Sequence, residues 1–163
     1  MRADGVVKEY AIGGAVAATF YIEPVATLDV DVFVPIERRP GQQIASLSSI
    51  FNYLTASGCA VEGEYVVIAD WLVQFLPATG PLLDEALAQA REIDIDGEKA
   101  TVISPEHLAA IALQTGRAKD KARYFQFLEA GILDRGRLEA IISRHGLTER
   151  WSYYERQFRE EEA

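Results

Sequence analysis

Two aspartates separated by one residue are the strongest candidates for chemistry in this sequence. Asp29 and Asp31 lie in the run LDVDVFV (residues 28–34), in which apolar and acidic residues alternate. This alternation predicts a strand, on which both carboxylates leave the same face about 7 Å apart. Both can reach one divalent cation, and Mg²⁺ typically takes one or two protein carboxylates together with phosphate oxygens. The alternative is an exposed strand whose outer face happens to be acidic.

A pair of glycines precedes the aspartates at a predicted turn from strand to helix. Residues 10–15 read YAIGGA, with Gly13 and Gly14 between a short apolar strand and a helix. Glycines at such a turn let the backbone approach a phosphate, and the free amides of the helix start can then bind it. Together the two motifs predict a site for a metal ion and a phosphate group.

The glycine pair followed by TLDVD (residues 27–31) resembles the signature of the DNA polymerase β-like nucleotidyltransferase superfamily. The stretch YAIGGAVAATFYIEPVATLDVDVFV is similar to the opening of its small bacterial members. These are uncharacterised and AbiEii-type nucleotidyltransferase-fold proteins, and some are toxins of toxin–antitoxin systems. Two later segments, VISPEHL (102–108) and GRAKD (116–120), also resemble them, so the similarity spans roughly residues 10 to 130.

The resemblance implies a catalytic arrangement and a set of partners. Asp29 and Asp31 would bind Mg²⁺ or Mn²⁺, and Gly13 and Gly14 would shape the phosphate turn. Thr27, which begins the matching segment, and Arg117 and Lys119 of the later one would contact the nucleotide. The implied reaction moves an NMP from an NTP to RNA or to a protein hydroxyl, and an antitoxin is a possible partner. A metal ion in such a site neutralises charge on the leaving pyrophosphate.

The third carboxylate of the resembled family falls on a neutral residue here. It belongs on a later strand, within WLVQFL (residues 71–76), and the best match is Gln74. An amide cannot act as a base or offset metal charge as aspartate does. Either Asp70 or Glu64 takes its place, or metal binding is weak. A second hypothesis is therefore a catalytically degenerate protein that binds a nucleotide or a protein partner without turnover, and a third is a purely structural role.

Basic residues gather around the GRAKD segment. Arg117, Lys119, Lys121 and Arg123 form two i,i+4 pairs beside an aromatic run. They are either a solvated helix face or a contact for NTP phosphates or an RNA end. The pair Arg38-Arg39, shortly after the aspartate strand, could also meet a phosphate or simply lie in a solvated loop.

The strands and helices predicted around these residues indicate an α+β fold. We expect a nucleotidyltransferase-like mixed β-sheet with flanking helices, followed by a C-terminal helical part. We expect a sheet domain over residues 1–103 and a helical part over 104–163 packed on it. Strands are predicted at 10–12, 28–34, 65–69, 71–76, 91–96 and 99–103. Helices are predicted at 14–21, from about 44 to 58, and at 82–90, 104–115, 119–130, 134–145 and from 148 to near the end.

Composition restricts the class of partner. The chain has 163 residues with 16 basic and 25 acidic side chains, so its net charge is −9. Residues 1–102 carry 6 basic and 15 acidic side chains, whereas residues 103–150 carry 8 and 6. This disfavours a general nucleic-acid binder but permits short-range contact at the helical part. One cysteine and the lack of an export or membrane-spanning pattern predict a cytoplasmic protein without membrane contact.

Overall fold

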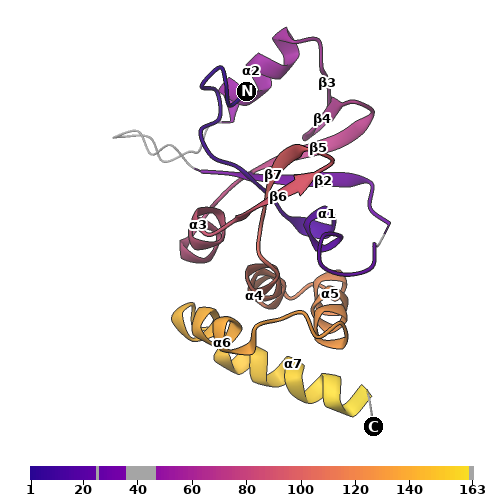
Figure 1. Cartoon of the computed structure of the whole chain (residues 1–163), viewed down its shortest axis with the longest axis vertical. Coiled ribbons are helices and arrows are strands. Elements are labelled where there is room, and N and C mark those ends of the chain that lie inside the picture. The colour runs from indigo at the N-terminus through magenta and orange to yellow at the C-terminus, as the bar shows by residue number, and fades with distance from the viewer. Residues whose placement is uncertain (25, 36–46, 162–163) are drawn as a thin grey trace.

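The computed structural model describes residues 1–24, 26–35 and 47–161, and these form a mixed sheet with helices on both sides (Figure 1). The sheet-forming part contains β1 (Ala11–Ile12), α1 (Gly14–Ala18), β2 (Asp29–Val34), α2 (Ser48–Ala56), β3 (Ala60–Glu62), β4 (Tyr65–Ile68), β5 (Trp71–Pro77), α3 (Pro81–Ala88), β6 (Arg91–Ile95) and β7 (Glu98–Val102). Four helices follow: α4 (Pro105–Thr115), α5 (Ala118–Glu129), α6 (Arg135–Arg144) and α7 (Thr148–Glu161).

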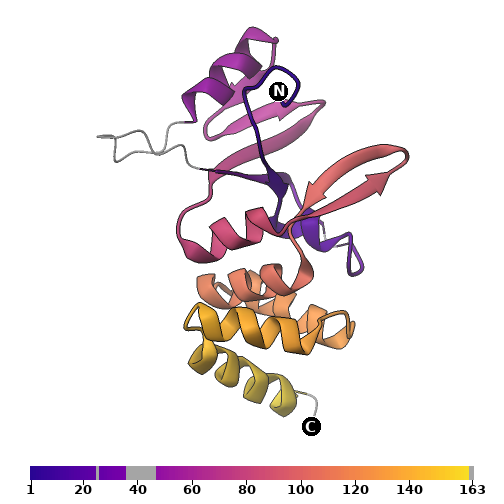
Figure 2. The same ribbon diagram turned by 60° about the vertical axis from the view of Figure 1, so that its left-hand side comes forward.

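The sheet has the strand order β3-β4-β5-β2-β1-β7-β6 within the described residues. β2 runs parallel to β5 and antiparallel to β1, and β1 runs parallel to β7. The two edges are hairpins, β3–β4–β5 on one side and β6–β7 on the other, and the second projects from the body in Figure 2. The predicted α+β class with a mixed sheet is thus confirmed.

Two hydrophobic cores lie on opposite faces of the sheet. One contains alternate residues of β2 together with Ile50 and Leu54 of α2. The other joins β1, β7, α1 and α3 to the four C-terminal helices, with Tyr124 and Phe127 of α5 fully buried in it. Because side chains on a strand alternate, Val30 and Val32 face the first core while Asp29 and Asp31 face the C-terminal helices.

Local sequence signals explain where several elements start and stop. Ser104 caps α4 by accepting from the His107 amide, with Pro105 at the first helical position. The Asp96-Gly97 turn of the β6–β7 hairpin has positive φ at both residues, 54° and 89°, as a tight two-residue turn requires. β7 ends and α4 begins close to the predicted change at residue 103. The division into two domains stays a prediction.

Several elements differ from the predicted ones. The helix predicted over 14–21 ends at Ala18, because the Thr19 hydroxyl donates to the Val16 carbonyl and the following aromatic residues turn into the core. The strand predicted over 65–69 ends at Ile68, since Ala69 and Asp70 form the hairpin turn with φ of 50° and 66°. β3 was missed because its three residues are all exposed and carry no alternation. The Ile44 start of the second predicted helix lies outside the described residues, within which α2 begins at Ser48.

Candidate functional site

The strand register places the predicted aspartates beside the predicted third position. Asp31 of β2 lies opposite Gln74 of the parallel strand β5, and Gln74 lies opposite Tyr65 of the antiparallel strand β4. Neighbouring strands lie about 4.8 Å apart, so these three side chains form a row across one face of the sheet. Asp29 lies two residues before Asp31, opposite Leu72.

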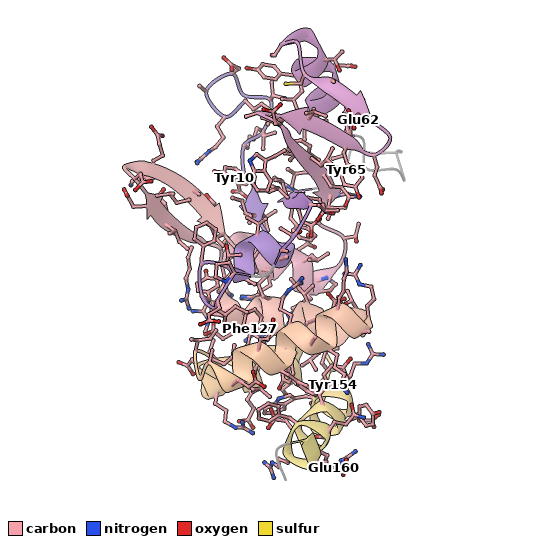
Figure 3. The ribbon with its side chains drawn as sticks, turned by 90° about the vertical axis from the view of Figure 1, so that its right-hand side faces the viewer. Tyr10, Glu62, Tyr65, Phe127, Tyr154 and Glu160 are labelled. Atoms are coloured by element: carbon pink, nitrogen blue, oxygen red, sulfur yellow. The ribbon has the colours of Figure 1, made fainter. Side chains whose placement is uncertain are left out.

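This row lines a cleft of about 1220 Å³ between the sheet and helices α4 and α5. In Figure 3, Tyr65 marks the sheet side and Phe127 the helical side of the molecule. The cleft brings together six of the seven residues predicted for the site: Gly14, Thr27, Asp29, Asp31, Arg117 and Lys119. The remaining one, Gly13, adjoins it through the backbone of Asp31. Arg38 and Arg39 lie outside the described residues.

The glycine pair makes room for the aspartate strand. The Gly13 amide donates to the Asp31 carbonyl at 2.9 Å, and a Cβ on Gly13 would overlap the Phe33 ring. Gly14 has a φ of +60°, and a Cβ there would overlap Oδ2 of Asp31. Both positions therefore require glycine for a reason visible within the chain. The phosphate-binding role of these glycines stays a prediction.

Thr27 orients the first aspartate. Its hydroxyl lies 3.0 Å from Oδ1 of Asp29 and 3.2 Å from the Asp29 carbonyl oxygen, so it donates to a carboxylate that faces the cleft. This bond restricts the carboxylate to one side of β2, next to Asp31. The sequence prediction placed Thr27 in the site as a nucleotide contact, whereas its observed contact is with Asp29.

Asp31 carries a charge that its surroundings only partly compensate. Burial raises the pKa of its carboxyl, and the neighbouring Asp29 raises it further. Lys119, Arg123 and Arg117 lower it through longer-range attraction. A carboxylate pair in this condition favours a bound cation, which would remove the repulsion and supply the missing positive charge.

The donor set fits one divalent cation better than a cluster of several. Two carboxylates on one strand face, open to a cleft, match the protein share of a Mg²⁺ site completed by phosphates and water. Among residues 1–24, 26–35 and 47–161, no group of three or more His, Cys, Asp or Glu side chains could hold a metal ion. Asp70 sits in the β4–β5 turn away from the cleft lining, and Glu64 lines the cleft without joining the aspartate pair.

The basic wall of the cleft, Arg117, Lys119 and Arg123, is partly neutralised by Asp120. The Asp120 carboxylate is 2% exposed, and it accepts from the Thr115 hydroxyl at 2.7 Å and from Nε of Arg117. Burial opposes ionisation, but the hydrogen bonds from Arg117 and Thr115 and the nearby guanidinium groups outweigh it and lower the pKa of Asp120. Arg123 lies 3.6 Å from the same carboxylate.

Lys119 differs from its neighbours on this wall. It is exposed, and within the described part of the chain it makes no hydrogen bond or ion pair. It still acts on Asp31 across the cleft. The GRAKD segment thus contains one arginine held mainly by its own helix and one lysine available to an anionic ligand.

Tyr65 was missed at the sequence level, although its position follows from the hairpin. A two-residue turn at Ala69 and Asp70 fixes the register of β4 against β5 and pairs Tyr65 with Gln74. Identifying that turn would have placed a phenol in the same row. Arg123 was recognised in the basic run but not as part of the cleft.

The two histidines lie in a different cluster. Nε2 of His107 and Nε2 of His145 both point at the Glu85 carboxylate, at 3.3 and 2.8 Å. Neither histidine lines the cleft.

The fold is similar to that of solved nucleotidyltransferase-like proteins. An antigenic nucleotidyltransferase-like protein from Paracoccidioides brasiliensis superposes with a TM-score of 0.54 at 16% identity, covering 83% of this chain and 78% of that one. ANT(2″)-Ia, solved in complex with adenylyl-2″-tobramycin, gives a TM-score of 0.45 at 18% identity, covering 99% of this chain and 92% of that one. No family model and no curated protein matches the sequence. The first likeness establishes a nucleotidyltransferase-like fold for this chain.

None of the helices in the described ranges is both long and apolar enough to cross a lipid bilayer.

Proposed function

We propose that this protein transfers a nucleotidyl group from an NTP to an acceptor oxygen, with one divalent cation held by Asp29 and Asp31. The observation that carries the proposal is the placement of these two carboxylates in one cleft, on a nucleotidyltransferase-like sheet, opposite the exposed Lys119. A protein with net charge −9 admits a triphosphate only where positive charge is supplied locally.

The proposal assigns a role to six residues of the cleft. Asp29, oriented by Thr27, and Asp31, accommodated by Gly14, hold Mg²⁺ or Mn²⁺. When bound, the cation neutralises phosphate charge and orients the α-phosphorus toward the acceptor. Lys119 and Arg123 hold the phosphate oxygens from the α5 side, since a charge-assisted hydrogen bond to phosphate is among the strong ones.

The acceptor and the partner belong to the proposal as well. The sequence resemblance favours RNA or a protein hydroxyl as acceptor, an AbiEii-like toxin role with an antitoxin partner, and a cytoplasmic setting. The mildly basic stretch 103–150 is the part of the chain best suited to meet RNA at short range.

A second candidate function, nucleotide or partner binding without turnover, has one observation in its favour. Gln74 stands beside Asp31 in the row where a third acid would complete the set. With an amide at this position, the cleft can hold a cation and a triphosphate while lacking a group that takes a proton.

One experiment separates the two candidates. The purified chain is incubated with each α-labelled NTP, Mg²⁺ or Mn²⁺, and a mixed pool of RNAs and proteins. Transfer of label that disappears in Asp29→Asn and Asp31→Asn, but survives in the exposed strand variant Glu62→Gln, supports catalysis. No transfer, together with a melting temperature raised by NTP and metal, supports binding alone. Neither transfer nor a thermal shift would overturn both.

A further inference from the structure

We propose that the acceptor is the ionised oxygen of a phosphate monoester, rather than a hydroxyl that must first lose a proton. This inference rests on the proposed nucleotidyl transfer and narrows its acceptor, so that an RNA would react at a terminal phosphate and a protein hydroxyl would not react. It is carried by the row Asp31, Gln74 and Tyr65, in which the residue nearest the cation-binding aspartate is an amide.

A hydroxyl acceptor needs a group that receives its proton as it attacks. The Gln74 side chain has no basic atom, since an amide oxygen accepts a hydrogen bond but does not take up a proton near neutral pH. Asp29 and Asp31 are engaged with the cation in this proposal. In the described residues no third carboxylate joins them. Glu64 lines the same cleft without joining the aspartate pair. The row Asp31, Gln74 and Tyr65 therefore offers an acceptor a hydrogen-bonding amide where a third carboxylate would offer a base, and Glu64 is tested separately below.

A phosphate monoester removes that requirement, because it carries its own negative charge and attacks directly. On the α5 side, its charge would be compensated by the same two cations that hold the NTP phosphates: the exposed Lys119, and Arg123, which lies 3.6 Å from the Asp120 carboxylate. The Gln74 amide can donate a hydrogen bond to a phosphate oxygen, which a carboxylate at the same position would repel.

The chemical step balances without a proton. A phosphate oxygen of the acceptor forms a bond to the α-phosphorus of the NTP, and the bond from that phosphorus to the bridging β-oxygen breaks. The electron pair leaves with pyrophosphate. One phosphoanhydride is exchanged for another, so the product is a phosphoanhydride-linked nucleotide and the reaction runs backward when pyrophosphate is added.

The test compares acceptors that differ only in the phosphate. An oligonucleotide with a 5′-phosphate is compared with the same oligonucleotide ending in a 5′-hydroxyl, and a sugar phosphate is compared with the free sugar, each with α-labelled NTP and Mn²⁺. We expect label on the phosphorylated member of a pair at least tenfold above its partner, and ³¹P resonances of an anhydride in the product. Which pair reacts identifies whether the phosphate belongs to a nucleic acid or to a small molecule.

A substitution of Gln74 tests the inference independently, because it should create an activity that the unsubstituted chain lacks. Gln74→Asp should add transfer to the hydroxyl acceptors and lower transfer to the phosphorylated ones at least tenfold. The matched control Gln126→Asp puts the same charge on the α5 side of the cleft and should add no hydroxyl transfer. Glu64→Gln should leave the acceptor preference unchanged.

Binding provides a readout that does not depend on turnover. By fluorescence polarisation with Mn²⁺ and a non-hydrolysable NTP, the preferred phosphorylated acceptor should bind at least tenfold more tightly than its dephosphorylated partner. Equal transfer to hydroxyl and phosphate acceptors by the unsubstituted chain, or loss of transfer in Glu64→Gln, would overturn the inference while the proposed function stands. Absence of transfer to every acceptor would overturn both.

Discussion

Two carboxylate sites in this protein differ in how their surroundings act on the negative charge: Glu85 of α3, and the pair Asp29 and Asp31 in the cleft. Glu85 of α3 accepts from Nε2 of His145 at 2.8 Å, from Arg144 at 2.6 Å and from His107 at 3.3 Å. Burial works against its charge, but these bonds outweigh burial and lower the pKa of Glu85 to about 2. In the cleft, burial and the neighbouring Asp29 raise the pKa of Asp31 instead.

The comparison distinguishes a carboxylate whose charge is compensated within the chain from a pair whose charge is left for a ligand to compensate. The Glu85 cluster joins α3 to α4 and α6, and each oxygen has a donor within the chain. Within the described residues, the two aspartate carboxylates have one side-chain donor, the Thr27 hydroxyl, and otherwise face the cleft. Burial of such a carboxylate pair lowers the stability of the folded chain, and a bound cation would offset that loss. Substitutions in the two groups should therefore have opposite effects on stability.

The largest expected effect follows from Gly14→Ala. Its Cβ would overlap Oδ2 of Asp31, and its φ of +60° costs an alanine roughly 1 kcal/mol in addition. We expect cation binding to be lost and the free energy of unfolding to fall by more than that, measured by Mn²⁺ titration and urea denaturation. Gly131→Ala is the matched control, because Gly131 has a φ of +62° with nothing near its Cβ position. Equal losses in the two variants would contradict the assigned contact.

The next effect is loss of the structural carboxylate. Glu85→Gln leaves the His107 and His145 rings and Arg144 facing an amide, and removing one partner of such a charged cluster is strongly destabilising. We expect the free energy of unfolding to fall by about 2 to 3 kcal/mol, below the value for a fully buried pair because Glu85 is partly exposed. Cation binding should persist. The exposed helix variant Glu129→Gln should change neither measurement.

Acidification should remove the contribution that the Glu85 charge makes to the free energy of unfolding. A lowered folded-state pKa means that the stability from Glu85 is fully present above its unfolded value of 4.5 and is lost as pH falls toward about 2. The difference in unfolding free energy between the unsubstituted chain and Glu85→Gln should therefore shrink as pH falls from about 6 to about 2. Urea denaturation across this range measures it, and a constant difference would contradict the role of the Glu85 charge.

A smaller effect of opposite sign is expected from Asp31→Asn. The raised pKa of Asp31 means that its ionised form is less favourable in the folded chain than in the unfolded one. An amide of the same shape removes this unfavourable charge and should therefore raise the free energy of unfolding slightly. The same variant should lose cation binding. Destabilisation of the size expected for Glu85→Gln would abolish the distinction between the two groups.

Local sequence patterns predicted the individual strands and helices of the site better than the way in which these elements pack together. The alternation around Asp29 and Asp31 gave the correct strand, and the family resemblance singled out Gln74, which the register of β2 and β5 puts opposite Asp31. The local contact of Arg117 with Asp120 is also encoded by an i,i+3 spacing, but it was interpreted as free positive charge. A short-range ion pair competes with a ligand for the same cation, and periodicity does not show which contact forms.

The position of α5 across the cleft is the part that local patterns do not contain. Lys119 and Asp31 are brought near by the packing of α4 and α5 under the sheet, which depends on the shared core around Tyr124 and Phe127. The overlap between Gly14 and Asp31 is likewise a contact between separate elements. Such contacts depend on three-dimensional packing, so the sequence alone predicted a phosphate role for Gly14 but not its contact with Asp31.

The smallest effect tests how firmly the first aspartate is held. Thr27→Val keeps the shape of the side chain but removes the hydroxyl that donates to Oδ1 of Asp29 at 3.0 Å. The loss of one hydrogen bond to a partly exposed charged group is worth about 1 kcal/mol, so Mn²⁺ affinity should fall about fivefold with little change in stability. Thr27→Ser keeps the hydroxyl and should retain the affinity. If instead Thr27→Val retains the affinity and Thr27→Ser loses it, packing by the Thr27 methyl group and not the hydrogen bond positions Asp29, and the contrast with the three donors that hold Glu85 becomes sharper.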